Sequence, residues 1–240
     1  MPFSISLSQT SLAIAILAST MGTYIALSPP NPSTKPIPST GDLMRRLNLT
    51  NKHFTKFALT PLGFLALQAS SLACFYPNIP QLIIRNGTAN GLNPDLITWS
   101  RATSIPLALV FCVGIPLRLV SYASLGKNFT FALAEPDTLK TTGIYHYVQH
   151  PSYTGVMVLV ACNMALLGRM DGALTCWIPP VWYKALRTLE LALLIPAGLS
   201  LSIFGVWTRV RQEERMLRAR FGAEWESWHA RTPRFIPWIF

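Results

Sequence analysis

Five long apolar stretches limit what this chain can fold into. Roughly 20 mostly apolar residues are needed for an α-helix to cross a bilayer. Stretches near that length run from Gln9 to Ser28, Phe57 to Tyr76, Thr103 to Tyr122, Tyr153 to Leu167 and Leu189 to Val206. We therefore predict an all-α, polytopic membrane protein with about five transmembrane helices.

Composition and charge agree with a lipid environment. Half of the 240 residues are hydrophobic and only 12% are charged, whereas a soluble domain carries about 25% charged residues. The net charge is +10, but the basic residues lie in short segments beside the apolar stretches. That placement favours anionic lipid head groups over nucleic acid, so we predict membrane association and no nucleic-acid binding.

Two further segments need an interpretation. The apolar piece Ala173–Tyr183 contains Pro179 and Pro180, which predicts a loop or a short interfacial helix because proline interrupts helices. No basic residue precedes the first stretch, so we interpret that stretch as a retained helix, although a cleaved signal peptide is the alternative. The Pro- and Ser-rich segment Pro29–Ser39 then serves as a linker.

The distribution of Lys and Arg predicts the topology. With five spans, the segments 29–56, 123–151 and 207–240 share one side and hold 14 basic residues, against 5 on the other side. Arg118 lies inside a span. Basic residues favour the cytosol, so we expect the loop before His150 and the C-terminal tail to lie there together.

The first polar motif runs from Gly143 to Gly155, with the sequence Gly-Ile-Tyr-His-Tyr-Val-Gln-His-Pro-Ser-Tyr-Thr-Gly. Glycine allows close backbone approach, and proline fits the first turn of a helix. His150 then lies beside a helix N-terminus, whose free N–H groups suit an anionic group. An aromatic belt at the membrane surface explains the tyrosines equally well.

The second motif is in the tail, Arg209-Val-Arg-Gln-Glu-Glu214. Arg209 and Glu213 are four residues apart and share a helix face. Leu217, Phe221 and Trp225 continue at four-residue steps, which predicts a cytosolic amphipathic helix with its apolar stripe on the membrane surface. On the residues alone, an ordinary juxtamembrane helix with a surface ion pair is the simpler interpretation.

No metal site is predicted. The four cysteines, Cys74, Cys112, Cys162 and Cys176, show no Cys-x-x-Cys spacing, and the four histidines do not cluster with them. Buried thiols of this kind are usually small core residues.

The motifs together resemble a known family. His-Pro-Ser-Tyr-x-Gly from His150, Arg-Val-x-x-Glu-Glu from Arg209, Phe-Gly-x-x-Trp-x-x-Trp from Phe221 and Leu125-Gly-Lys-Asn-Phe129 are similar to the isoprenylcysteine carboxyl methyltransferases and the related phospholipid methyltransferases. The resemblance covers roughly residues 118–240. It implies a cytosol-facing pocket for S-adenosylmethionine, closed by the C-terminal segment, a lipid substrate that enters from the bilayer, and residence in the endoplasmic reticulum.

Carried over by position, the resemblance implies site residues. The expected cofactor-binding residues are Asp137, Thr138, Leu139, Lys140, Tyr145, His150, Pro151, Ser152, Tyr153 and Glu213, and Arg209 is expected to face the substrate carboxylate; Arg209 and Glu213 are the catalytic candidates. The chain departs from the family pattern at Gln149, where Arg is usual, and at Asp137, where many members have His. Trp225 and Trp228 replace the more usual Tyr. Three regions follow: an N-terminal helix and linker (1–56), two membrane helices (57–122) and the catalytic region (123–240).

The implied reaction is methyl transfer to the C-terminal carboxylate of a prenylated cysteine. The nearest alternative is N-methylation of phosphatidylethanolamine, which needs a base to remove a proton from the ammonium; Glu214 or His146 could serve. An NADPH sterol reductase with a similar Gly-x-x-Trp ending, and an inactive membrane adaptor, are further alternatives. The expected partners are prenylated protein C-termini or a lipid, and the sequence indicates no oligomeric state.

Overall fold

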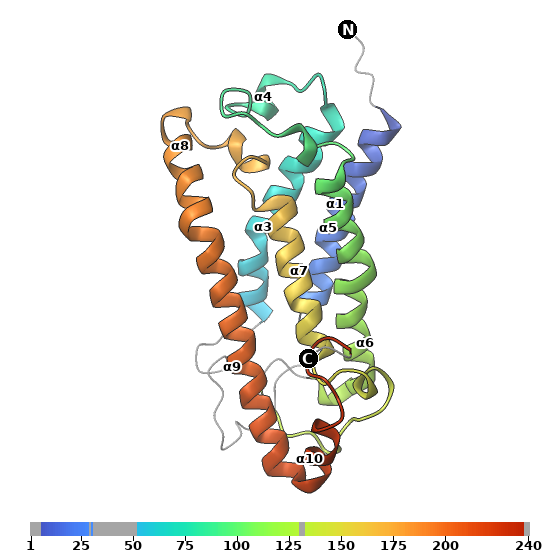
Figure 1. Ribbon diagram of the computed structural model, residues 1–240. Coiled ribbons are helices and arrows are strands. Elements are labelled where there is room, and N and C mark those ends of the chain that lie inside the picture. The colour runs from blue at the N-terminus through green and yellow to red at the C-terminus, as the bar shows by residue number, and fades with distance from the viewer. Residues whose placement is uncertain (1–5, 29, 31–51, 130–132, 238–240) are drawn as a thin grey trace. The chain divides into compact units, whose positions relative to one another are not determined.

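The computed structural model describes residues 6–28, 30, 52–129 and 133–237, and these residues form helices and connecting turns with no strand among them (Figure 1). This confirms the predicted all-α class. The predicted linker Pro29–Ser39 lies outside the described residues apart from Pro30.

Four helical stretches are long and apolar enough to cross a membrane. They are α1 (Leu7–Leu27), α3 (Lys52–Phe75), the run Pro94–Leu125 and the run Pro180–Phe221. A fifth apolar helix, α7 (Pro151–Leu167), has 17 residues and is shorter. The multi-pass membrane architecture is therefore confirmed, with four long helices and one short one where five spans were predicted.

Short elements connect and complete these helices. The run Pro94–Leu125 contains η1 (Pro94–Leu96), α5 (Arg101–Leu109), η2 (Val110–Gly114) and α6 (Ile115–Leu125). The remaining short elements are α4 (Gln81–Ile84), η3 (Gly126–Asn128), η4 (Gly143–His146), η5 (Ala173–Cys176) and α10 (Ala223–His229).

The last long helix begins earlier than predicted. The segment expected to be separate, Ala173–Tyr183, divides in two: η5 is a short turn, and Pro180 is the first residue of α8 (Pro180–Leu189). Proline is well placed there because the first turn of a helix uses no N–H of its own. The chain then continues through η6 (Glu190–Leu194) and α9 (Ile195–Phe221).

Both long composite helices contain one turn of π-helix directly before an Ile-Pro pair. Turn η2 precedes Ile115-Pro116, and η6 precedes Ile195-Pro196. Proline has no N–H to donate to the preceding turn and its ring crowds the backbone there. A local widening of the helix accommodates both effects without ending the helix.

The described chain divides into two compact units, and the first contains residues up to Ile25, Leu59–Val113 and Val158–Ser200. Its core packs Leu12 and Ile16 of α1 against small residues of α3, Ala66, Ala69 and Ala73. The Ser70 hydroxyl donates to the Ala13 carbonyl (3.1 Å), and Asn163 Nδ2 donates to Thr23 Oγ1 (3.1 Å). Small residues and interhelical hydrogen bonds of this kind hold membrane helices together.

A closed ion-pair network fixes the start of the last helix in this unit. Arg169 binds both carboxylate oxygens of Asp171 (2.8 and 2.6 Å), and Arg187 contacts the same carboxylate at 3.3 Å. Arg187 also binds Glu190, which accepts the Met170 N–H at 2.8 Å. Glu190, the only acidic residue in the predicted fifth stretch, is therefore buried with its charge compensated.

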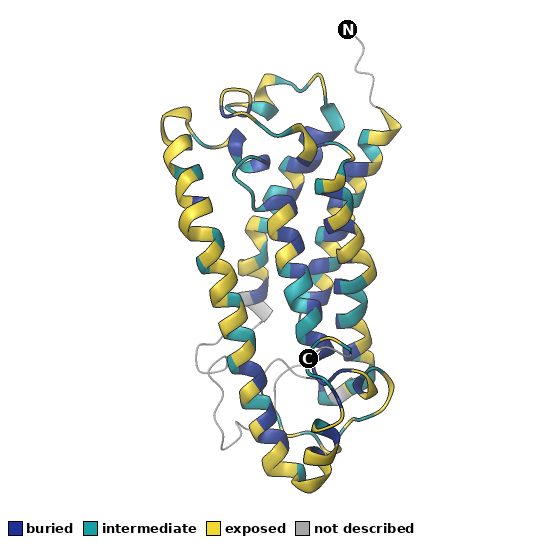
Figure 2. Cartoon of the chain, in the orientation of Figure 1, coloured by how far each residue is buried: buried dark blue, intermediate teal, exposed yellow. Residues whose placement is uncertain are grey.

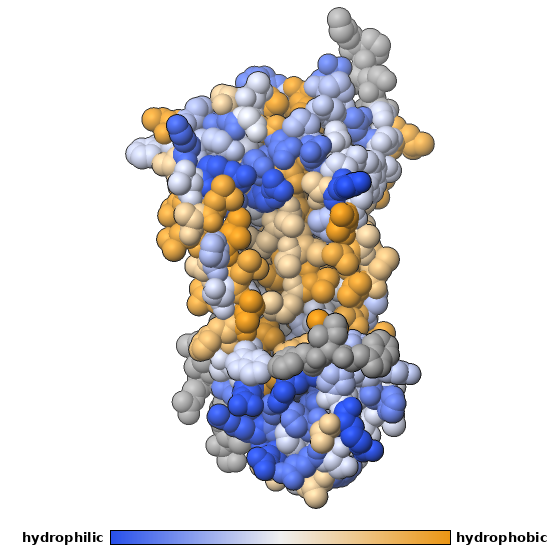
Figure 3. All heavy atoms as spheres, viewed as in Figure 1, coloured by the Kyte–Doolittle hydropathy of each residue, from blue (hydrophilic) through white to orange (hydrophobic). Residues whose placement is uncertain are grey.

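Large apolar side chains are exposed along the last helix. Leu191, Leu193, Leu201, Ile203 and Phe204 are all more than half exposed, and Figure 2 shows the exposed residues along α8 and α9. Figure 3 shows apolar side chains at the surface over the membrane-length helices. Such a surface is stable in lipid, which is as apolar as the side chains themselves.

The second unit contains residues 26–58, 114–157 and 201–240, of which the described part includes the C-terminal helices. Its core joins Leu133, Tyr145, Met216, Leu217, Trp225 and Trp228, with Phe221 packed against them. Gly222, at φ +51°, ends α9 and allows α10 to turn back. The prediction of a membrane-surface stripe over Leu217, Phe221 and Trp225 is therefore wrong, because these residues build the core of this unit.

Gly155 marks a close approach of α7 to α6 in the second unit. A Cβ added to Gly155 on α7 would lie 3.0 Å from Arg118 Cγ, 3.1 Å from the Gly114 carbonyl oxygen and 3.2 Å from Leu117 Cβ. The close backbone approach predicted from this glycine is confirmed. Because one of these neighbours is backbone, the contact has little freedom to adjust.

We expect Gly155→Ala to lower the stability of the protein by about 1–3 kcal/mol, the usual range for overpacking. The matched control is Gly63→Ala on α3, where the added methyl meets nothing within 4 Å and the gain in helix propensity is up to about 1 kcal/mol. Thermal unfolding of both variants in detergent micelles, followed by circular dichroism, measures the difference. Equal melting temperatures for the two variants would contradict the close packing of α7 on α6.

Candidate active site

A cavity of about 330 Å³ lies in the second unit. Part of its lining is polar: Arg118, Asn128, Thr138, Lys140, Tyr145, Gln149, His150, Ser152, Tyr153, Arg209 and Glu213. The rest of its lining is mainly apolar: Leu27, Leu125, Phe129, Leu133, Ala134, Pro136, Leu139, Pro151, Val156, Gly205, Val206, Met216, Leu217 and Trp228. Such a lining suits a ligand, or a pair of ligands, with both a charged part and a long apolar part.

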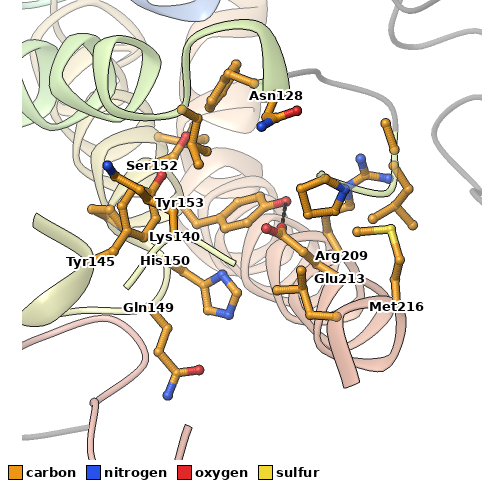
Figure 4. Close-up of a pocket in the computed structure, with 18 of the residues that line it drawn as sticks. Asn128, Lys140, Tyr145, Gln149, His150, Ser152, Tyr153, Arg209, Glu213 and Met216 are labelled. Atoms are coloured by element: carbon orange, nitrogen blue, oxygen red, sulfur yellow. Dashed lines mark hydrogen bonds between the residues drawn. The ribbon is translucent and has the colours of Figure 1, made fainter. Parts of the chain in front are cut away.

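The cavity brings together nearly all the residues that the sequence singled out. Thr138, Leu139 and Lys140 come from the loop before η4, Tyr145 from η4, His150–Tyr153 from the start of α7, and Arg209 and Glu213 from α9 (Figure 4). Asp137 is the exception, because it does not line the cavity. Gly143, the first residue of η4, has a positive φ of 66°, which glycine adopts readily.

His150 stands immediately before the first residue of α7 and is buried. Both of its ring nitrogens lack a hydrogen-bond partner within the described part of the chain, and Nε2 is 3.7 Å from Glu214 Oε1, too far for a hydrogen bond. A buried polar group without a partner is costly. The ring therefore presents two polar atoms, within a cavity lining, that a ligand can satisfy.

Tyr153 and Glu213 connect α7 with α9 across the cavity lining. The Tyr153 hydroxyl donates to Glu213 Oε2 (2.8 Å; Figure 4). The Arg209 side chain hydrogen-bonds to the same hydroxyl. Arg209 is buried, although it carries a full charge. The Arg209 guanidinium and the Glu213 carboxylate therefore both line the cavity, and both hydrogen-bond to the Tyr153 hydroxyl.

Tyr145 remains neutral in this environment. Burial raises the pKa of its hydroxyl, and the negative charge of Glu213 acts in the same direction. Its backbone carbonyl accepts the Trp228 indole N–H at 3.0 Å. The neutral Tyr145 phenol hydrogen-bonds to the Ser121 side chain, and the C-terminal helix fixes the Tyr145 backbone.

Gln149, where the resembled family usually has Arg, is also buried in the cavity lining. Its side-chain amide donates to the carbonyls of Thr232 and His229. In this chain the position therefore supplies a neutral amide that binds the C-terminal segment. Trp225 and Trp228 are buried as well, and both belong to the core of the second unit.

Arg118 is a cavity residue for which the sequence analysis assigned no role. It is buried on α6, and its three guanidinium nitrogens bind the Ala26 carbonyl (2.9 Å from Nε), Ser152 Oγ and the Tyr122 hydroxyl. The Tyr122 hydroxyl donates to the same Ala26 carbonyl. An arginine within an apolar span was the available signal, because intramembrane charges mark functional sites.

The helices and the cavity define a class: a multi-pass helical membrane protein with an internal site that is part polar and part apolar. Residues 107–186 match the model of the isoprenylcysteine carboxyl methyltransferase (ICMT) family. That segment contains the His-Pro-Ser-Tyr motif and Asp137–Lys140, and it ends before Arg209. The match confirms the resemblance to this family.

A curated relative leads to the same family. The chain is 28% identical over 132 residues to the protein-S-isoprenylcysteine O-methyltransferase of Schizosaccharomyces pombe. The matched region covers 53% of this chain and 47% of that protein. The chain therefore spans about half the length of this relative. No solved structure gave a significant match.

We expect Arg118→Lys to destabilise the protein by about 2 kcal/mol or more. The single ammonium of lysine cannot replace a guanidinium whose three nitrogens bind three separate oxygen atoms. The control is Arg101→Lys, at an exposed position at the start of α5, which should change stability by less than about 0.5 kcal/mol. Thermal unfolding in micelles compares the two. A stable Arg118→Lys variant would show that the three contacts contribute little.

Proposed function

We propose that this protein transfers a methyl group from S-adenosylmethionine to the C-terminal carboxylate of a prenylated cysteine. The observation that carries the proposal is a single cavity in which Arg209 and Glu213 of α9 accompany His150 and Tyr153 at the start of α7, beside an apolar lining. A prenylated cysteine has a carboxylate and a long apolar chain. The polar part of the lining suits the carboxylate, and the apolar part suits the chain. The family match supports the same reaction.

The residues present fit the proposed cofactor. S-adenosylmethionine has an amino-acid end, a ribose and an adenine, all rich in hydrogen-bonding groups. The two unsatisfied ring nitrogens of His150, the Glu213 carboxylate and the Tyr145 phenol can hold such groups. When bound, S-adenosylmethionine supplies a methyl group that is already activated for transfer.

Arg209 is the proposed anchor for the acceptor. A C-terminal carboxylate has a pKa of about 3.5 and is ionised at neutral pH, so no residue has to remove a proton. A guanidinium binds a carboxylate through forked, charge-assisted hydrogen bonds. We propose that Arg209 holds one carboxylate oxygen and leaves the other free to attack the methyl group.

The remaining task of the protein is to position the two reactants and exclude water. Correct positioning alone supplies roughly 7–11 kcal/mol in well-oriented reactions. Leu133, Met216 and Leu217 belong to the buried core and also line the cavity. They provide an apolar boundary that keeps solvent from competing with the carboxylate.

The charge distribution supports a cytosolic position for this site. Fourteen basic residues lie on the side that holds the tail and the loop before His150, and this side is expected to face the cytosol. A cytosolic site suits prenylated protein C-termini as the substrate. We propose the endoplasmic reticulum as the membrane, because the resemblance implies it.

The structure gives less support to phospholipid N-methylation. That reaction needs a base beside an ammonium, and the two candidates, Glu214 and His146, are not among the residues that line the cavity. Glu214 accepts from Arg234 Nε at 2.7 Å, and His146 is exposed. Carboxyl methylation requires no base, and Arg209 in the cavity lining supplies the carboxylate anchor that this reaction needs.

The direct test is methyl transfer from radiolabelled S-adenosylmethionine in membranes that contain this chain. A farnesylated cysteine analogue and phosphatidylethanolamine are supplied as separate acceptors. A base-labile label on the cysteine analogue is the expected result, because a methyl ester is cleaved by base. Label in the phospholipid alone, or no label in either acceptor, would overturn the proposal.

Two variants separate the proposed roles. Arg209→Ala should lose about 100-fold in turnover, because the carboxylate is no longer held in line. Glu213→Ala should raise the dissociation constant for S-adenosylmethionine about tenfold, which corresponds to one charge-assisted hydrogen bond. Isothermal titration in micelles measures the binding, and the radiolabel assay measures the turnover.

The controls are Arg215→Ala and Glu224→Ala, which remove the same charges from exposed positions on α9 and α10. Both should retain the parent values. If the Arg209 and Glu213 variants behave like these controls, the assignment of the two residues is wrong.

A further inference from the structure

The segment that follows α10, residues 230–237, crosses the start of α7 and is called the C-terminal strap below. The carbonyls of Pro233 and Arg234 accept the backbone N–H groups of Gln149 and His150 (both 2.9 Å), and the Phe235 carbonyl accepts the Thr154 hydroxyl (3.0 Å). The strap therefore fixes the backbone from which the His150 ring enters the cavity lining.

The side chain of Gln149 ties the strap to the last residue of α10. Gln149 Nε2 donates to the carbonyls of Thr232 and His229, so the nitrogen end of this amide is identified by two acceptors. Its oxygen then faces His229 Nδ1 at 2.7 Å. Because an amide oxygen only accepts, the Nδ1 atom of His229 carries a proton.

Arg234 determines the state of the other ring nitrogen. Its Nη2 atom lies 3.2 Å from His229 Nε2, while its Nε donates to Glu214 Oε1 at 2.7 Å. Arginine only donates, so Nε2 must accept and carries no proton. The contacts thus define His229 as a neutral imidazole with its single proton on Nδ1.

Charged and titratable groups surround this imidazole. Arg234 on the strap, Arg211 and Glu214 on α9 and His150 before α7 all act on it. Trp225 stacks on the ring, with centroids 4.3 Å apart and an interplanar angle of 18°. Burial lowers the pKa of His229; Glu214 opposes this shift, while the neighbouring Arg234, His150 and Arg211 act in the same direction as burial.

We propose that His229 is a proton-sensitive latch for the C-terminal strap. A second proton, on Nε2, would face the Arg234 donor with a like charge and no acceptor between them. The contact between Arg234 and His229 would then be lost, and the strap would release the N–H groups of Gln149 and His150. This proposal concerns the strap itself and does not depend on the reaction catalysed.

The sign of the effect follows from the lowered pKa. A histidine whose pKa is depressed in the folded state stabilises that state while it is neutral. The stabilisation is complete above the ordinary pKa of 6.5 and falls as the pH drops below it, because the released state takes up the proton first. One pH unit below 6.5, the released population should be higher by at most about tenfold, the limit for a site that takes up no proton while the strap is bound.

Hydrogen exchange of the full chain in detergent micelles tests the latch. The backbone amides of Gln149 and His150 are followed by mass spectrometry between pH 7.5 and 5.5, after correction for intrinsic exchange. Their protection should fall over this range, by up to about tenfold, while the amides of α3 keep theirs and report that the fold is intact. Equal protection at both pH values would overturn the proposal.

Three variants make the test specific. In His229→Gln, a glutamine amide can donate to Gln149 and accept from Arg234 but does not titrate. The fall in amide protection between pH 7.5 and 5.5, called the pH step, should therefore disappear. Arg234→Met removes the opposing donor, so the step should become smaller. His146→Gln, at an exposed histidine in η4, should keep the parent step. A step that persists in His229→Gln, or that vanishes in His146→Gln, would assign the titration to another group.

Discussion

The described part of the second unit depends on the first turns of α7, because α6, α9 and the strap all make contacts there. Gly155 packs against α6, Ser152 binds Arg118, and Tyr153 donates to Glu213 on α9. The strap accepts the N–H groups of Gln149 and His150. The strap thus holds the two residues that lead into α7, and the His150 carbonyl in turn accepts the N–H groups of Tyr153 and Thr154 in the first turn of the helix.

Apolar length in the sequence predicted the membrane helices, and the family resemblance named ten of the residues that line the cavity. Contacts between distant residues could not be predicted in this way. The bond from Gln149 to Thr232 crosses 83 positions, and the partners of Arg118 come from three helices. The stripe at Leu217 and Trp225 was assigned to the membrane because periodicity identifies an apolar face but not what covers it.

Gln149 shows how one departure from a family pattern changes the electrostatics of a site. An arginine at this position would place another cation among His229, Arg234 and Arg211. The neutral amide instead accepts from His229 and donates to two carbonyls. The charge balance around Glu214 is therefore set by Arg234 on the strap, which ties the conformation of the chain terminus to the protonation of one imidazole.

The length of α7 determines which bilayer thickness this helix can match. Its 17 residues rise about 26 Å at 1.5 Å per residue. The hydrocarbon layer of an endoplasmic reticulum bilayer is about 27 Å thick, and that of the plasma membrane about 32–33 Å. An upright α7 therefore matches the thinner bilayer, whereas a thicker one would have to compress around it. Because His150 stands at the very start of this helix, an upright α7 in the thinner bilayer would place the His150 ring near the level where acyl chains meet head groups.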